Sequence, residues 1–212
     1  MPSHAAVERA ALTDLLDSLG PDAPTLCEGW TTHDMAAHLA LRDRIPAAWP
    51  GLALRRWAGR TERIHERFKA DHAYAECVSM VRRGAPAWSP MGAPVLAELT
   101  NLAEYVIHHE DVRRAQPEWV PRAVPAERVD AVWRQLRRSA RMMFRRAPDG
   151  IVLARAGTAA VLTAKRGEPT VTVAGEPIEL LLYAANRRAA ARVDVSGDEA
   201  ALARLATARL GL

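Results

Sequence analysis

The chain of 212 residues is poor in cysteine, in lysine and in long apolar runs. Its two cysteines, Cys27 and Cys77, are too few for a disulfide framework. Only Lys69 and Lys165 are lysines among 29 basic residues, so nearly all of the positive charge is arginine. No apolar run approaches the roughly 20 residues of a membrane span, and the first residues do not resemble a signal peptide. These absences predict a cytoplasmic protein without a membrane partner.

Sequence motifs for several common reactions are also absent. There is no H-E-x-x-H, P-loop, G-x-G-x-x-G or G-x-S-x-G pattern, so proteolysis, nucleotide hydrolysis and dinucleotide redox chemistry have no support. The formal charge is +4, but the arginines are scattered and accompany no nucleic-acid-binding motif. We therefore expect no nucleic-acid partner. One arginine cluster is typical of a solvated helix face: Arg137, Arg138, Arg141, Arg145 and Arg146.

Apolar residues recur at helical spacing up to Pro148. A capping box of Thr31 and Asp34 marks the start of the second helix, which we expect to end before Pro46. The other predicted helices in this part cover residues 4–19, 59–83, 95–115 and 126–146.

The character of the sequence changes after Pro148. Short β-rich runs separated by glycine and proline come first, and they are followed by a predicted helix, a strand in ARVDVSG and a closing helix. The two helices cover residues 178–191 and 198–210. We therefore predict a mainly α protein in two parts, a helical bundle over residues 1–148 and a small α+β segment over residues 149–212.

Polar residues at helical spacing border the apolar face of the predicted helix 95–115. Residues four apart on a helix are offset by about 40°, and residues seven apart nearly coincide. One longitudinal stripe therefore contains Thr100, Glu104, His108 and Asp111. His109 is rotated by about 100° from His108, so we exclude it from a site that includes Glu104.

A Glu-x-x-x-His pair offers a metal ion one oxygen and one nitrogen, so a third ligand must come from another helix. His38 lies at or beside the inward face of the second predicted helix and is the natural candidate. Helical bundles commonly build metal sites from facing helices in this way. Two histidines and one carboxylate leave a coordination position open, which is typical of catalytic sites.

Simpler roles for the same residues remain open at this point. Glu104 and His108 fit an ordinary pair on a helix surface, and His38 fits a core histidine. Asp111 fits a residue that orients the His108 ring better than it fits a fourth ligand, and Thr100 is placed to support the same stripe. Cys27 is expected to be a small buried side chain. The remaining histidines are expected at the surface: His4, His33, His65 and His72.

Two segments resemble the DinB/YfiT-like metalloprotein superfamily. TLCEGWTTHDMAAHLALRD resembles the entry to its second helix, where a G-W-T segment precedes a metal-binding histidine, and NLAEYVIHHEDVRRAQPEW resembles its later Glu-x-x-x-His segment. VTVAGEPIELLLYAANRRAAARVDVSGD is similar to the C-terminal domain of the mycothiol-dependent maleylpyruvate isomerase group. The resemblance implies a DinB-like four-helix bundle in which His38, Glu104 and His108 bind one divalent ion, zinc or alternatively nickel or iron.

The resemblance also implies a chemistry. Members use a low-molecular-weight thiol, so the expected function is a mycothiol-dependent transferase or isomerase whose metal activates the thiol against an electrophilic substrate. By this resemblance, Arg187 or Arg188 is expected to contact an acidic substrate in the C-terminal part. The alternatives are a metal- or ligand-binding module without enzymatic activity and, ranked lower, a mononuclear iron oxygenase. The sequence does not indicate an oligomeric state.

Overall fold

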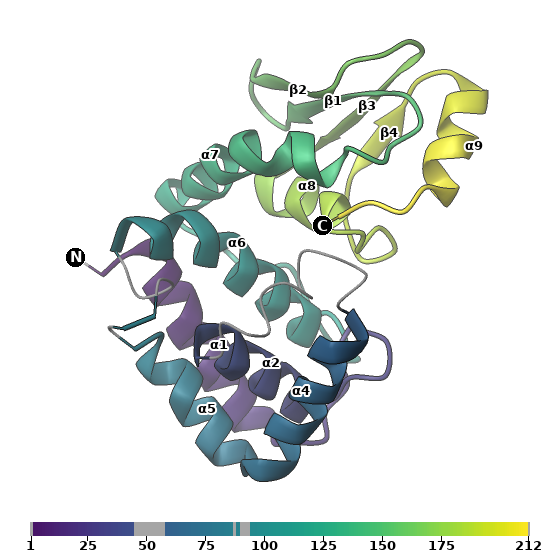
Figure 1. Ribbon diagram of the computed structural model, residues 1–212. Helices are drawn as coiled ribbons and strands as arrows, with labels where there is room; N and C mark the ends of the chain where they lie inside the picture. The colour runs from purple at the N-terminus through teal and green to yellow at the C-terminus, as the bar shows by residue number, and fades with distance from the viewer. Residues whose placement is uncertain (1, 45–57, 87, 90–93, 212) are drawn as a thin grey trace. The chain divides into compact units, whose positions relative to one another are not determined.

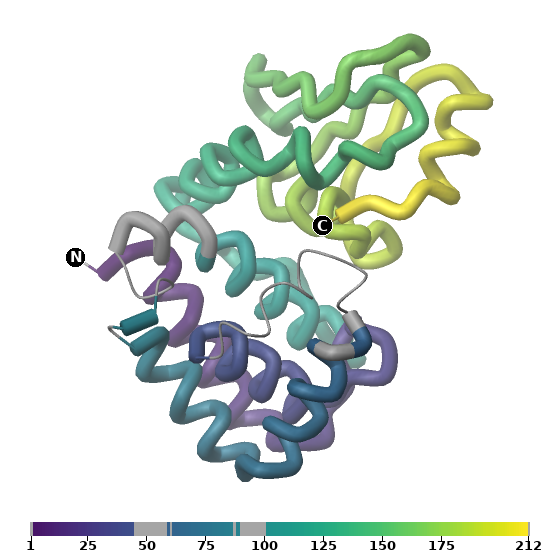
Figure 2. Tube along the Cα trace, in the orientation of Figure 1, coloured from purple at the N-terminus to yellow at the C-terminus, as the bar shows by residue number. Residues whose placement is uncertain are grey.

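The computed structural model describes residues 2–44, 58–86, 88–89 and 94–211, and only the backbone of residues 58, 60 and 94–100. The described part of the chain is mainly α-helical, as predicted, and its strands form one four-stranded sheet (Figure 1). Its internal contacts divide it into two compact units, Met1–Arg122 and Ala123–Leu212. The path of the chain through each unit can be followed from purple to yellow in Figure 2.

The first unit consists of packed helices. Helix α1 packs against α6 and α5, while α2 packs against α5 and α4. Their bounds are α1 His4–Leu19, α2 Thr32–Arg44, α4 Ala58–Asp71, α5 Tyr74–Arg83 and α6 Pro94–Arg113. These contacts bring α2 and α6, which are far apart in the sequence, into one core.

Local sequence signals explain where the first two helices begin. The Ser3 side chain accepts a hydrogen bond from the backbone N–H of Ala6 and so caps α1. The predicted cap of Thr31 and Asp34 is confirmed on the Asp34 side, because the Asp34 carboxylate accepts hydrogen bonds from the backbone N–H and the hydroxyl of Thr31, at 2.9 and 3.0 Å. The Thr31 hydroxyl in turn accepts from the backbone N–H of His33 at 3.2 Å. The Thr32 hydroxyl, directly after the cap, donates to the backbone carbonyl of Gly20.

The long helix predicted over residues 59–83 is wrong, because two helices occupy this stretch. Helix α4 ends at Asp71, and α5 begins at Tyr74 after an extended Ala73. The ring Nδ1 of His72 hydrogen-bonds the carbonyl of Phe68, which satisfies one of the free acceptors at the end of α4. The carboxylate of Glu76 accepts from the Ala73 N–H at the start of α5. No glycine or proline marks this break, so the periodicity alone does not reveal it.

The second unit combines the sheet with three helices. Its strand order is β2-β1-β3-β4, with β1 and β3 parallel and the outer pairs antiparallel. Helix α7 packs against α8 and β2, and both α8 and α9 contact β3. The helix predicted over residues 178–191 is shorter, because α8 ends at Ala184. The bounds are α7 Ala126–Met143, β1 Gly150–Arg155, β2 Val161–Lys165, β3 Thr170–Gly175, α8 Pro177–Ala184, β4 Asp194–Ser196 and α9 Glu199–Thr207.

The division between the units differs from the predicted boundary at residue 148. Helix α7 is grouped with the second unit because its apolar residues pack with that unit's own elements. Val132, Trp133 and Leu136 are buried on this face of α7. The assignment of functional domains stays a prediction. Within the described ranges, no helix is both long and apolar enough to cross a bilayer.

Candidate metal centre

Helices α2 and α6 bring His38, Glu104 and His108 together. The Nε2 atom of His38 lies 3.2 Å from Oε1 of Glu104, and the Nε2 atom of His108 lies 3.1 Å from the same oxygen. The two imidazole rings are 5.1 Å apart between centroids and nearly perpendicular, at 73°. One donor atom from each residue therefore faces a common point.

The donor atoms fit a divalent cation in type and in separation. Zinc bonds to imidazole nitrogen and carboxylate oxygen are roughly 2.0–2.2 Å long, so two donors on one ion lie at most about 4.4 Å apart. The two nitrogen–oxygen separations fall well inside this limit, and all three donor atoms lie within 4.8 Å of one another. The Glu104 side chain is 26% exposed, which leaves this group reachable from solvent. Metal binding itself stays a prediction.

Asp111 holds the His108 ring from the other side. Its Oδ2 atom lies 2.9 Å from Nδ1 of His108, and the carboxylate is fully buried. A carboxylate only accepts hydrogen bonds, so Nδ1 of His108 carries a proton. When the ring gives up its second proton, as it must to bind a metal ion, the lone pair is therefore on Nε2, the nitrogen that faces Glu104. This is the placement expected of a residue that orients a metal-binding histidine.

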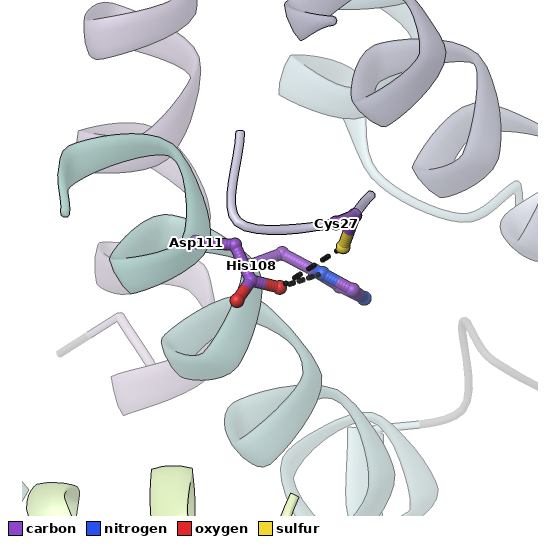
Figure 3. A group of neighbouring side chains, drawn as sticks. All are labelled: Cys27, His108 and Asp111. Atoms are coloured by element: carbon purple, nitrogen blue, oxygen red, sulfur yellow. Dashed lines mark hydrogen bonds and ion pairs between the residues drawn. The ribbon is translucent and has the colours of Figure 1, made fainter. Parts of the chain in front are cut away.

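Cys27 belongs to the same group, although it was expected to be only a small buried side chain. Its Sγ lies 3.4 Å from Oδ2 of Asp111, the oxygen that also faces His108 (Figure 3). The neighbouring Leu26 donates its backbone N–H to the Asp111 carbonyl at 3.0 Å. The loop that precedes α2 is thus attached to α6 beside the candidate centre. A cysteine in this loop was the available signal, but spacing within one helix cannot find a contact across 84 residues.

Aromatic rings line another side of the group. The Trp30 indole lies 5.2 Å from the His38 ring and stacks on the His65 ring at 5.0 Å. His65 was expected at the surface, and this is wrong, because it is only 4% exposed. Its Nε2 donates to the backbone carbonyl of Asp34 at 3.0 Å, which ties α4 to α2.

Arg42, one turn after His38 on α2, is a buried charge beside the candidate ligands. Its Nε lies 3.6 Å from Oε1 of Glu104, and its Nη1 donates to the side-chain oxygen of Asn101 at 2.7 Å. An arginine in this position compensates the negative charge of Glu104. Nothing in the sequence distinguishes Arg42 from the other arginines, because arginines are common throughout the chain.

The ionisation of the three candidate ligands reflects these contacts. Burial alone raises the pKa of Glu104, but the charge of Arg42 and the hydrogen bonds from both histidines outweigh it and hold this pKa well below its ordinary value. Burial also opposes the charge on His108, yet hydrogen bonds with Asp111, Cys27 and Glu104 raise its pKa well above the ordinary value. Burial lowers the pKa of His38. The two carboxylates of Glu104 and Asp111 therefore favour a positive charge on the His108 ring that lies between them.

The other predicted site residues lie elsewhere or cannot be placed. Thr100 is part of α6, but its side chain lies outside the described residues. Arg188 donates to the carbonyls of Leu205 and Ala206 at the end of α9, both at 2.7 Å. Arg187 donates to the carbonyl of Ala185 at 2.8 Å. A role for Arg187 or Arg188 in substrate binding stays a prediction.

Comparison with solved structures identifies the fold. A crystal structure of the mycothiol-dependent maleylpyruvate isomerase matches with a TM-score of 0.60 and 18% identity, over 91% of this chain and 90% of the isomerase. This chain has the fold of that isomerase. A mutant of the same enzyme, with one histidine replaced by alanine, matches with a TM-score of 0.58 over the same shares of both chains, again at 18% identity. No protein-family model and no curated protein matches the sequence.

The isomerase fold confirms the predicted resemblance at the level of architecture. The match extends over 91% of the chain, so both the helical unit and the sheet-containing unit take part in it. At 18% identity, the likeness shows the fold alone.

Proposed function

We propose that this protein binds one divalent metal ion in a DinB-like four-helix bundle and acts as a thiol-dependent transferase or isomerase. The observation that carries the proposal is the convergence of His38, Glu104 and His108 from two helices, with Asp111 fixing the proton on the far side of His108. The solved structures of the same fold are of an enzyme named for its use of mycothiol, which favours a small thiol as the co-substrate. Zinc fits the donor set best, with nickel or iron as alternatives.

The residues of this chain each have a distinct part in such a site. His38, Glu104 and His108 would hold the ion, and three protein ligands leave a position for an exchangeable ligand. A bound divalent cation would lower the pKa of a small thiol, so that the nucleophilic thiolate is present at neutral pH. Trp30 would keep water away from the His38 side, because its ring covers that imidazole. Arg42 would keep Glu104 ionised and oriented.

The chemistry that follows is addition of the thiolate sulfur to an electrophilic carbon. A new carbon–sulfur bond forms, and either a leaving group departs with the electron pair or the adduct later releases the thiolate. The first outcome is a transfer reaction that gives a thioether. The second permits rotation about a former double bond and is an isomerisation, the reaction class of the enzyme that shares the fold. The proposed partners are accordingly a small thiol and a small electrophile in the cytoplasm.

A thiol-consumption assay tests this function. Metal-loaded protein is incubated with mycothiol and either an activated haloarene or maleylpyruvate, and thioether formation or isomer conversion is followed. We expect turnover by the wild type and by His33→Ala, which removes a histidine of α2 that contacts the carbonyl of His72 and lies outside the candidate centre. We expect turnover to vanish in His38→Ala. Metal-loaded wild type that is inert toward a broad panel of electrophiles would favour the module without enzymatic activity.

A further inference from the structure

A cavity in the second unit is lined by three arginines. Arg137 and Arg141 reach it from α7, and Arg166 reaches it from the residue directly after β2. Residues of β2 itself complete the wall: Val161, Leu162, Thr163 and Ala164. The cavity has a volume of about 580 Å³, which is within the range of small-molecule sites. Figure 1 shows α7 running beside the sheet in this unit.

The helix α7 does not need these two arginines for its own packing. Its buried face consists of Val132, Trp133, Leu136 and neighbouring apolar residues, whereas Arg137 and Arg141 are exposed. The two arginines are four residues apart and therefore lie on one face of the helix, where like charges disfavour the helix slightly. Their placement thus brings no evident gain in stability.

The positive charge in the cavity is not neutralised by the protein. No aspartate or glutamate lines the cavity, and across the described part of the chain no ion pair involves Arg137, Arg141 or Arg166. Elsewhere in the same unit arginines are paired, since Arg155 lies 2.7 Å from Asp130 and Arg204 lies 2.9 Å from Asp149. Three guanidinium groups without an ion pair to any described residue therefore line one cavity.

We propose that this cavity binds a small phosphorylated molecule. Guanidinium groups donate paired hydrogen bonds that match the oxygens of a phosphate group. Thr163 adds a hydroxyl, and β2 is the edge strand of the sheet, so the backbone groups on its outer side are not used by a neighbouring strand. The aliphatic side chains of Val161 and Leu162 provide a surface for the organic part of the ligand.

A nucleic acid fits the cavity less well. Proteins that hold single strands combine a basic groove with aromatic side chains on which bases stack. None of the described residues that line this cavity is aromatic, and β2 contributes mainly aliphatic side chains to it. The proposal is independent of the metal centre, because every residue that lines the cavity belongs to the second unit.

Nuclear magnetic resonance titration of the full chain with glycerol 3-phosphate tests the proposal. At constant ionic strength, we expect saturable shifts of the backbone amides of residues 161–166 in the wild type and equally in His38→Ala, which lacks a candidate metal ligand. The double variant Arg137→Gln/Arg141→Gln should bind at least roughly tenfold more weakly. Arg138→Gln is the matched control, because it removes an exposed arginine of the same helix that does not line the cavity, and it should change the affinity less than about twofold.

Several outcomes would overturn the assignment. Absence of saturable shifts in the wild type would exclude the site. If Arg138→Gln lost as much affinity as the double variant, binding would reflect the general positive charge of the surface. If sulfate bound as tightly as glycerol 3-phosphate, the cavity would bind anions in general. If citrate bound more tightly than glycerol 3-phosphate, its ligand would be a carboxylate and not a phosphate. Tighter binding of a single-stranded oligonucleotide, in proportion to the number of arginines retained, would indicate a nucleic-acid surface. Thermal melting of each variant is the control that separates a loss of binding from unfolding.

Discussion

At the scale of single residues, Asp111 determines which nitrogen of His108 is available to an ion. Its carboxylate is fully buried and accepts from Nδ1 of His108, so the lone pair of the neutral ring is on Nε2. The same oxygen lies 3.4 Å from the sulfur of Cys27. The orientation of one candidate ligand therefore depends on a helix residue three positions away and on a loop residue from another part of the chain.

Replacement of Asp111 by asparagine tests this orienting role. Asp111→Asn keeps the shape of the side chain but removes the charge, so we expect the affinity for zinc to fall roughly 10–100-fold. Competition with a chromophoric chelator measures the change. Unchanged affinity in a folded Asp111→Asn variant would contradict the proposed role.

Cys27 gives a smaller and chemically distinct prediction. Cys27→Ala removes a donor to Asp111 and should weaken zinc binding roughly twofold to tenfold, because a thiol is a weak donor, while Cys27→Ser should restore most of the loss. Cobalt-substituted wild type distinguishes support from direct ligation. We expect no sulfur-to-cobalt charge-transfer band, and such a band that disappears in Cys27→Ala would make Cys27 a ligand.

The sequence predicted the residues of the candidate centre better than their surroundings. Glu104, His108 and Asp111 share one helix, so regular spacing is enough to place them on one stripe. His38 was added because a third ligand was needed and because of the resemblance. Cys27, Trp30 and Arg42 were not identified, because their contacts join segments whose packing depends on the tertiary fold.

At the scale of helices, α1 and α6 are joined by a buried group of charges. Glu8 of α1 is fully buried and lies 2.8 Å from Nδ1 of His109 on α6. Arg122 pairs with Glu8 and also with the buried Glu110, 2.7 Å from its Nε. His109 thus serves helix packing, which agrees with its exclusion from the candidate metal ligands.

This group makes stability depend on pH in a defined window. Burial opposes the charge of Glu8, but the hydrogen bonds and charges of His109 and Arg122 outweigh it and lower its pKa from 4.5 to about 2. The unfolded chain therefore binds this proton first as pH falls, and stability is lost between about pH 4.5 and 2. The contribution above this window is at most roughly 3 kcal/mol.

Urea denaturation of the wild type and of Glu8→Gln measures this contribution. The variant does not titrate at this position, so we expect it to be less stable than the wild type at pH 6, and the difference should shrink by pH 3. A difference that stays constant from pH 6 to pH 3 would contradict the role of Glu8. Comparison of the two proteins removes the effect of other carboxylates that titrate in both.

The sequence predicted the beginnings of helices better than their ends. Helices with caps and regular apolar spacing were located well, as α1 and the start of α2 show. The interruption at His72 and Ala73 was not, because a side-chain contact with the carbonyl of Phe68 ends α4 without any helix-breaking residue. The early end of α8 at Ala184 did have a signal in the sequence, because Asn186 adopts the left-handed conformation with φ 66°, in which asparagine commonly ends a helix.

At the scale of the whole molecule, the fold matches that of a solved enzyme although few residues are identical. The chain matches the isomerase structure over 91% of its length at 18% identity, and no family model matches it. Short segments around the candidate ligands carried enough signal to predict this architecture. The division of contacts at Arg122 was not predicted, because the grouping of α7 with the sheet depends on how its apolar face packs.

The central claim is that one cation is shared by His38, Glu104 and His108. Elemental analysis of protein purified without chelators, from medium supplied with zinc, nickel and iron, tests it most directly. We expect about one divalent ion per chain in the wild type and in His33→Ala, and almost none in folded His38→Ala and Glu104→Ala. Metal-free wild type, or equal metal content in all four proteins, would contradict the claim.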